Sequence, residues 1–147
     1  MKLRYAKNSD FGFLIEGLEQ NRVLENRARE QIRAKPSDRE QFKEAISKKN
    51  IRIIEEDGKP VAFLYFRTDF KVMYFSGKIF WIDLIYVKES HRRKGLGKLL
   101  YNDAIGIARK RGYRRVTIDI FESNTASKKF HKRLGFKPVY AIYHKKI

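Results

Sequence analysis

The chain has 147 residues, which favours a single domain, and 42% of them are hydrophobic, so a substantial core can form. It contains no cysteine, which excludes disulfides, thiolate nucleophiles and thiolate metal sites and fits a cytoplasmic location. The first residues do not resemble a signal peptide, and no apolar run approaches the ~20 residues that span a bilayer. We therefore expect a soluble protein that does not contact membranes.

Positive charge is concentrated in the second half of the chain. The formal net charge is +17, and residues 88–147 hold 17 basic and 4 acidic side chains, a net charge of +13. Such a field attracts anions, whether a phosphorylated cofactor, a nucleic acid or an acidic protein. For single lysines a solvated surface is the simpler interpretation. The cluster that begins at Arg92 favours an anionic ligand.

The first 50 residues predict a short strand followed by helices. Residues 2–6 alternate in polarity as a strand does, and residues 11–34 have a helical pattern of apolar positions. Three residues can cap this helix: Asn8, Ser9 and Asp10. Two features could divide it: Gly17 and the polar stretch 19–22. Pro36 ends the pattern, and residues 37–40 have the capping-box spacing for another helix that reaches about Lys48.

The middle of the chain has the pattern of a sheet. Strand-like runs at about 51–56 and 60–68 flank Asp57 and Gly58, a dipeptide that closes tight hairpins. The run over 78–87 is nearly all apolar, which predicts a strand in the centre of the sheet.

The last third alternates between helices and strands. A helical stripe begins near Leu96 and ends at Gly112, and residues 114–121 predict a strand. Asn124 can cap a further helix that Gly135 stops, and residues 136–147 are again strand-like. Helices interspersed with strands predict a single domain of the α/β (α+β) class.

A basic loop with two glycines separates the central strand from the helix that follows it. Gly95 and Gly97 leave the backbone bare where a helix N-terminus presents unpaired N–H groups and the positive end of its dipole. This arrangement favours phosphate binding, although a flexible basic turn would have the same composition. The loop matches neither the Walker A motif nor the dinucleotide-binding fingerprint.

Together with the segment downstream, this loop resembles the GCN5-related N-acetyltransferase (GNAT) family. Arg92, Gly95 and Gly97 match the family's [Q/R]xxGx[G/A] signature for the pyrophosphate of coenzyme A. A second signature, roughly thirty residues downstream, is matched at five positions: Asn124, Ala126, Phe130, Gly135 and Phe136. The resemblance covers about 51–137 and is loose over 1–50. It implies a central mixed, mostly antiparallel sheet with splayed central strands, flanked by about four helices.

The resemblance also implies one acetyltransferase domain over 1–147, with a helical acceptor-side region at 11–48 and an acetyl-CoA-binding core at 78–136. The Arg92 side chain would steady the loop. Backbone amides of six residues would hold the pyrophosphate: Arg93, Lys94, Gly95, Leu96, Gly97 and Lys98. Backbone groups of three residues would pair with the pantetheine arm as if it were an added strand: Ile85, Tyr86 and Val87. Asn124 would contact the pantetheine, and one or more of Lys128, Lys129 and Lys132 would meet the adenosine phosphates. No metal is implied.

Three carboxylates are candidates for the base that deprotonates an acceptor amine. Asp119 lies five residues before Asn124, where the ribosomal-protein N-terminal acetyltransferases of the family place a glutamate. Asp83 lies in the central strand, at the position of a carboxylate in polyamine-acetylating relatives. A buried charge costs several kcal/mol unless it is paired or used, so a salt bridge to an arginine is the alternative role for Asp83. Glu122 is the third candidate.

The candidate acid departs from the family pattern. Seven residues after Asn124 the family usually carries a tyrosine that protonates the departing thiolate, and here that residue is His131. An imidazole with a pKa of ~6.5 can donate this proton, although a coenzyme A thiolate can also leave unprotonated. Three tyrosines could replace it: Tyr86, Tyr140 and Tyr143.

The C-terminus also departs from the family, which usually ends in two strands after the second helix. About a dozen residues remain after Gly135, so the last strand is missing, fused with its predecessor or supplied by a partner chain. The protein could thus be a monomer or a homodimer.

These features predict an N-acetyltransferase that moves the acetyl group of acetyl-CoA to a primary amine by direct attack. Peptide or protein N-termini, protein lysines, small amines and aminoacyl-tRNA remain open as acceptors. The alternative is a non-catalytic module with an acyl-CoA fold, which would bind RNA, DNA or an acidic partner through its basic C-terminal half.

Overall fold

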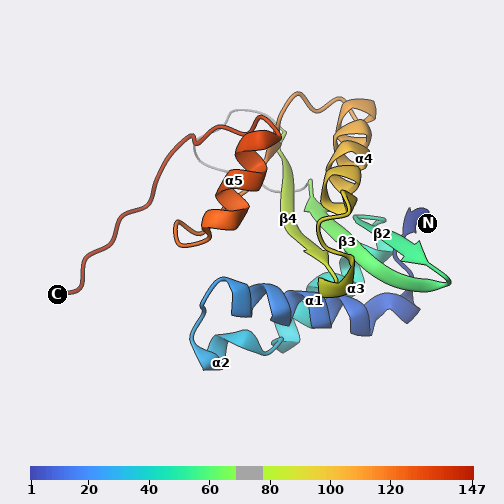
Figure 1. The fold of residues 1–147 in the computed structure, drawn as a ribbon, viewed down its shortest axis with the longest axis horizontal. Coiled ribbons are helices and arrows are strands. Elements are labelled where there is room, and N and C mark those ends of the chain that lie inside the picture. Colours follow the sequence, from blue (N-terminus) through green and yellow to red (C-terminus); the bar gives the residue numbers. More distant parts are fainter. Residues whose placement is uncertain (69–77) are drawn as a thin grey trace.

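The computed structural model describes residues 1–68 and 78–147. Within these residues five strands form one mixed sheet in the order β1-β2-β3-β4-β5 (Figure 1). Neighbouring strands are antiparallel from β1 to β4, and β5 runs parallel to β4. The strands are β1 (Lys2–Tyr5), β2 (Ile51–Glu56), β3 (Lys59–Arg67), β4 (Phe80–Val87) and β5 (Val116–Thr117). The helices are α1 (Phe11–Leu24), the single turn α2 (Arg29–Ile32), α3 (Pro36–Ser47), α4 (Leu96–Lys110) and α5 (Thr125–Arg133).

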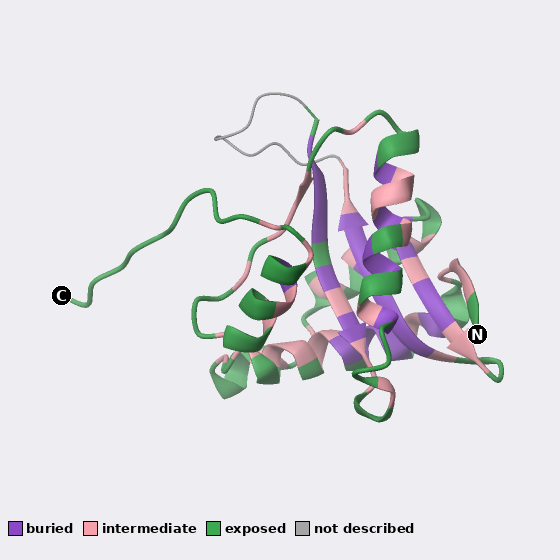
Figure 2. Cartoon of the chain, turned by 45° about the horizontal axis from the view of Figure 1, so that its top comes forward, coloured by how far each residue is buried: buried purple, intermediate pink, exposed green. Residues whose placement is uncertain are grey.

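The helices cover both faces of the sheet and make two separate cores (Figures 1 and 2). Residues of α1 and α3 pack on one face, against side chains such as Phe63 and Tyr86, to form the α1/α3 core. Residues of α4 pack on the other face, against side chains such as Leu64 and Phe80, to form the α4 core. Apolar side chains of α5 lie against this second core. The predicted mixed sheet with flanking helices is confirmed.

β4 contains one residue more than β3 over the length on which the two strands pair. Tyr65 pairs with Leu84 and Phe66 pairs with Ile82, so Asp83 has no partner in the ladder and forms a β-bulge. Before the bulge, Phe80 and Ile82 enter the α4 core; after it, Leu84 and Tyr86 enter the α1/α3 core. Side chains of a regular strand alternate between two faces, and the bulge reverses this alternation.

β4 and β5 lie side by side for only two residue pairs. Phe80 pairs with Val116 and Trp81 with Thr117, and the strands then part. The strand predicted over 114–121 is therefore wrong in length, because residues 118–121 leave the ladder. This parting occurs next to Asp83, so the bulge and the splay open the sheet at the same place.

The helical region of 11–34 is divided, but at neither of the two predicted positions. α1 ends at Leu24, and the chain turns over 25–28, where Asn26 has a left-handed backbone (φ 54°). Gly17 lies inside α1 for a packing reason. A Cβ there would lie 2.3 Å from the ring of Phe63, so only glycine lets α1 approach the sheet this closely.

The starts of α1 and α3 also differ from prediction. Asp10 makes no capping hydrogen bond to α1; its carboxylate accepts hydrogen bonds from Arg4 (2.7 and 2.9 Å) and from the Lys7 amide (2.7 Å). Burial opposes ionisation of Asp10, but these donors outweigh it and hold its pKa below the usual value. α3 begins at Pro36, which occupies the first helical position, and the Asp38 carboxylate accepts from the Lys35 amide (2.7 Å).

The other predicted helix ends are confirmed. Gly112 follows α4 with φ 84° and Gly135 follows α5 with φ 88°. The Asn124 side chain accepts a hydrogen bond from the Ser127 amide (3.1 Å) and caps α5. The strand predicted over 136–147 is wrong for the single chain, because this segment has no regular structure and extends away from the body of the molecule (Figure 1). No described helix combines the length and apolar character needed to cross a membrane.

Candidate active site

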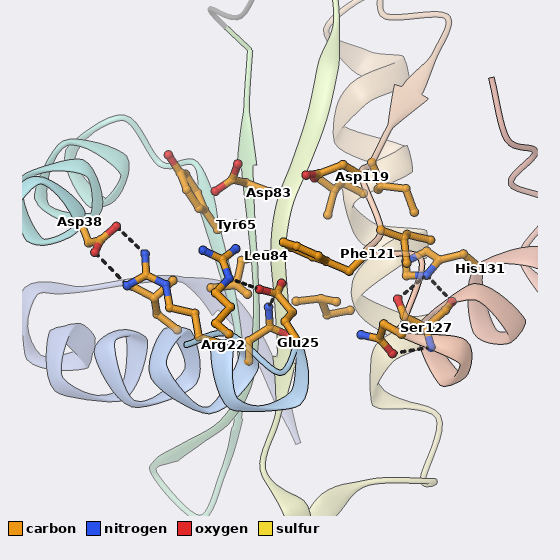
Figure 3. A pocket seen from close by; sticks show the side chains of 18 of the residues that line it. Arg22, Glu25, Asp38, Tyr65, Asp83, Leu84, Asp119, Phe121, Ser127 and His131 are labelled. Carbon is orange, nitrogen blue, oxygen red and sulfur yellow. Dashed lines mark hydrogen bonds and ion pairs between the residues drawn. The ribbon is translucent and has the colours of Figure 1, made fainter. Parts of the chain in front are cut away.

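A cavity of about 270 Å³ lies where β4 and β5 part (Figure 3). Residues 82–85 of β4 form one wall, and residues 118–121 after β5 form the opposite wall. The end of α1 and the start of α3 close one side, while α4 and α5 contribute Tyr101 and His131 on the other. The cavity therefore connects the region predicted to bind the acceptor with the region predicted to bind the cofactor.

Two of the candidate bases line this cavity together. Asp83 projects from the β4 bulge and Asp119 from the opposite wall (Figure 3). Asp83 makes the ion pair that its alternative role requires, because the Arg67 guanidinium lies 3.5 Å from its carboxylate. The Asp83 side chain is 31% exposed, and this exposed part faces the cavity. Burial raises the pKa of Asp83 above its usual value; Arg67 opposes this rise, and the charge of Asp119 adds to it.

The α1/α3 side of the cavity contains two further carboxylates, and each has an arginine partner. Asp38 of α3 accepts from Arg22 of α1 at 2.9 and 3.0 Å. Glu25 accepts from Arg27 in the turn after α1. Arg27 also lies over the ring of Phe121 (5.2 Å), so it bridges the turn after α1 and the wall after β5.

His131 is buried and held by hydrogen bonds on both ring nitrogens. Its Nδ1 lies 2.7 Å from the backbone carbonyl of Ser127, so Nδ1 carries the proton and donates it to this oxygen. Nε2 is then the acceptor for the hydroxyl of Tyr101. Burial lowers the pKa of His131 below its usual value, although the bond to Ser127 opposes this shift. At pH 7 the ring is neutral, and Nε2 has no proton to donate.

We expect His131 to titrate below pH 6.5 and to be an Nδ1–H tautomer at pH 7, which long-range ¹H–¹⁵N NMR spectra measure directly. The imidazolium would need a proton on Nε2, where the pocket provides no described acceptor other than Tyr101. Replacing Tyr101 by phenylalanine removes a donor to the neutral ring, so the midpoint should rise. An Nε2–H tautomer, or a midpoint above 6.5 in the wild type, would contradict this arrangement.

The glycine loop leads directly into α4, with Gly95 at its N-cap and Gly97 in its first turn. Arg93 (φ 59°) and Gly95 (φ 79°) both adopt the left-handed conformation, which orients successive amides for an anion. The amides of the first turn of α4 have no carbonyl four residues earlier to accept them. The Arg92 Nε donates to the carbonyl of Val87 (3.0 Å) and so ties the loop to the end of β4. A Cβ on Gly97 would lie 3.1 Å from the ring of Phe130.

The structure brings some of the predicted site residues together and separates others. Asp83, Ile85, Asp119, Asn124 and His131 all line the cavity. The side chains of the remaining predicted residues are elsewhere. Tyr86, whose hydroxyl lies 3.4 Å from Glu16, and Arg92 line a second, more open hollow. Lys128 forms an ion pair with Glu122, the third candidate base, and neither lines the cavity. Tyr140 and Tyr143 lie on the extended C-terminal segment and are also outside it.

Sequence analysis missed several residues of the cavity. Arg22, Glu25, Arg27 and Asp38 belong to the region where the family resemblance is loose, so no motif identified them. Ser127 could have been found from spacing, because it lies four residues before His131 on the same face of α5. No group of three or more acidic or histidine side chains that could hold a metal ion occurs in 1–68 or 78–147.

A mixed sheet that splays around a cavity, with a glycine loop leading into the next helix, is the architecture of an acetyltransferase fold. The chain belongs to the acetyltransferase (GNAT) family, whose family model matches residues 18–136. A curated relative, an uncharacterised N-acetyltransferase of Methanocaldococcus jannaschii, is 34% identical over 85 residues. These residues are 58% of this chain and 38% of that protein, so the match spans well under half of the relative.

Solved structures with the same fold match almost the whole chain. A GCN5-related N-acetyltransferase from Ralstonia eutropha has a TM-score of 0.83 at 19% identity, covering 99% of this chain and 97% of that one. An aminoglycoside N-acetyltransferase in complex with CoA has a TM-score of 0.70 at 20% identity, covering 99% of each chain. At these identities the structures establish the fold, and the predicted family is confirmed.

Proposed function

We propose that this protein transfers the acetyl group of acetyl-CoA to a primary amine by direct attack of the amine. One observation carries the proposal. The cavity between β4 and β5 holds two carboxylates, Asp83 and Asp119, and lies beside a glycine loop whose amides, over residues 93–98, make no described hydrogen bond to another loop or strand. A base beside an acyl-carrying cofactor is the minimum that N-acetylation requires.

The residues around the loop fit a pyrophosphate and a pantetheine arm. The left-handed backbone at Arg93 and Gly95 and the first turn of α4 supply N–H donors with positive potential. Beyond the point where β5 departs, the edge of β4 that faced it is open, so backbone groups over 85–87 can pair with an extended amide-containing arm. Acetyl-CoA would supply an acetyl group activated as a thioester.

The acceptor amine must lose a proton before it attacks. Deprotonating a lysine-like amine with a pKa of ~10.4 at pH 7 costs roughly 4.6 kcal/mol, and an α-amine costs about 1 kcal/mol. A carboxylate with a raised pKa is a better base than an ordinary one, and Asp83 has this property. Asp119 is the second candidate, on the opposite wall. We assign proton removal to this pair, acting directly or through one water.

The charge of the cavity favours an acceptor that carries more than one positive charge. Asp38 and Glu25 are balanced by Arg22 and Arg27. Of the other two carboxylates, Asp83 pairs with Arg67 at 3.5 Å, and no ion pair of Asp119 is described. The lining of the cavity therefore carries more negative than positive charge, although the chain as a whole has a net charge of +17. Carboxylates that face a narrow cavity attract ammonium groups and repel carboxylate-bearing amines.

Three four-carbon amines test both the reaction and this preference: 1,4-diaminobutane, butylamine and 4-aminobutyrate. Release of the CoA thiol can be followed with a thiol reagent without background, since the chain has no cysteine. We expect kcat/KM to fall in the order diamine, monoamine, amino acid, by about tenfold at each step. A lysine-containing peptide with a free N-terminus extends the panel to protein acceptors.

Acetyl-CoA binding without thiol release for any of these acceptors would contradict the proposed transfer. A faster reaction with 4-aminobutyrate than with the diamine would contradict the proposed charge preference alone. Failure to bind acetyl-CoA would favour the non-catalytic alternative, which predicts RNA binding that weakens steeply as salt rises.

A further inference from the structure

One opening of the cavity can be located from residues that line it and also reach solvent. Phe121 lines the cavity and is 46% exposed, and the Arg27 side chain lines it and is 33% exposed. Phe121 ends the wall after β5 (Figure 3), whereas Arg27 belongs to the turn after α1. Because they come from opposite walls, the two side chains lie on either side of this opening.

Arg27 is fixed in this position by hydrogen bonds to α1 and the turn. Its amide donates to the carbonyl of Arg22 (3.2 Å). Its guanidinium donates to the Glu25 carboxylate, which also accepts from the Asn21 side chain (2.9 Å). The guanidinium lies 5.2 Å from the centre of the Phe121 ring, a distance at which a cation and an aromatic face attract each other. This contact, the Arg27–Phe121 bridge, joins the two walls across the opening.

The wall after β5 has little else to hold it at a fixed distance from α1. Its ladder with β4 ends at Thr117, and Ile118 then packs against the α4 core. Residues 119–120 make no described backbone hydrogen bond. Phe121 follows them, and its ring is joined to Arg27. The Arg27–Phe121 bridge therefore sets the width of the opening between the turn after α1 and this wall.

The opening at the bridge is distinct from the region proposed to hold the cofactor. Along α1, Glu16 and Gln20 line the second hollow, which also contains Arg92 at the start of the glycine loop. The cavity is lined instead by residues near the end of α1 and by the turn that follows it. The bridge therefore lies toward the end of α1 that is farther from the glycine loop, where an acceptor can enter without crossing the cofactor.

We propose that the Arg27–Phe121 bridge restricts the acceptor to a primary amine at the end of an unbranched chain. This inference rests on the proposed function and defines its acceptor more closely. A pocket for a drug-sized ligand measures roughly 300–1,000 Å³. The cavity of about 270 Å³ must hold both the acetyl end of the cofactor and the acceptor. A linear amine or a lysine side chain can enter such a space end-on, whereas an amine carried on a ring would require the bridge to part.

Heptylamine and cyclohexylmethylamine test this restriction, because both have the same number of carbon atoms and the same CH₂–NH₂ group, and only the second carries a ring. With acetyl-CoA, we expect kcat/KM of the wild type to be about 100-fold higher for heptylamine. In Phe121→Ala and in Arg27→Met this ratio should fall below about tenfold, because the ring amine reacts faster. The double variant should behave like either single variant, since both substitutions remove the same contact.

Arg29→Met and Leu24→Ala are the matched controls. Arg29 is an exposed arginine in α2, Leu24 is 54% exposed at the end of α1, and neither lines the cavity. Both controls should keep the wild-type ratio of kcat/KM values. General damage to the site would slow both amines together, whereas a wider opening speeds the reaction of the ring amine alone.

Equal kcat/KM values of the wild type for the two amines would overturn the proposed restriction and leave the proposed transfer intact. A ratio that is unchanged in both bridge variants would do the same. Release of the CoA thiol with neither amine, by a protein that binds acetyl-CoA, would contradict the transfer itself and this inference with it.

Discussion

Replacing Gly97 by glutamate should abolish acetyl-CoA binding, with a loss of affinity on the order of 100-fold or more by calorimetry. Two effects act in the same direction. A Cβ at this position would lie 3.1 Å from the ring of Phe130, so this ring must move by a few tenths of an ångström to make room. The added carboxylate would also lie at the positive end of the helix, where it competes with a phosphate for the same amides.

Gly106→Glu is the matched control for this substitution. Gly106 lies in the same helix, and a Cβ there meets no atom within 4 Å. The control variant carries the same extra charge without touching the loop, so it should bind acetyl-CoA as the wild type does. Equal binding by the Gly97 variant and the wild type would remove the glycine loop from the cofactor site. Circular dichroism of both variants checks that α4 remains helical.

Replacing Asp119 by asparagine should lower kcat by about 100-fold at pH 7, since a general base contributes 10²- to 10⁴-fold. The substitution should also change the pKa of Asp83, which can be measured without an activity assay. The negative charge of Asp119 helps to raise the pKa of Asp83, so this pKa should fall in the variant. Carboxyl ¹³C NMR measures the shift. In the wild type, activity should be lost as the pH falls through the raised Asp83 pKa. In the variant, the acidic limb of the pH–activity profile should move to lower pH.

Glu122→Gln is the control for the loss of a carboxylate near Asp119. The Glu122 side chain is 91% exposed and paired with Lys128, outside the cavity. This variant should keep the wild-type kcat and leave the Asp83 titration unchanged. An Asp119→Asn variant with full activity would eliminate Asp119 as the base and leave Asp83. A loss of activity with no change in the Asp83 pKa would mean that the two carboxylates do not sense each other's charge.

The turns and helix ends could be predicted from the sequence, because each depends on residues that are close together in the chain. The hairpin at Asp57 and Gly58, the stops at Gly112 and Gly135, and the Asn124 cap each depend on residues a few positions apart. The family signatures lie in the same kind of segment, where a loop leads into a helix. Such features could be found from one sequence because the backbone conformation and the residue type are linked at each position.

The features that create the cavity depend on residues far apart in the chain. The bulge at Asp83 is defined by its register against Tyr65 and Phe66 of β3, which no periodicity within β4 reveals. The parting of β4 and β5 is seen only in their pairing, and Ile118, directly after β5, packs against the α4 core instead of continuing the ladder. The ion pair on the α1/α3 side of the cavity requires α1 and α3 to bring Arg22 and Asp38 together over sixteen positions of sequence. These pairings are set by tertiary contacts, which a single sequence does not show.

The bulge in β4 has a consequence for how this fold can change in evolution. Packing specifies the residues on both sides of Asp83, since Ile82 belongs to one core and Leu84 to the other. The residue between them must be present to reverse the alternation, but neither core constrains its identity. Deleting it would turn Leu84 and Tyr86 toward the wrong core, whereas substituting it would alter the cavity and the ion pair with Arg67. The bulge is thus a position that must be occupied, but neither core determines which residue occupies it. A substitution there can change the chemistry of the cavity without disturbing the packing of either core.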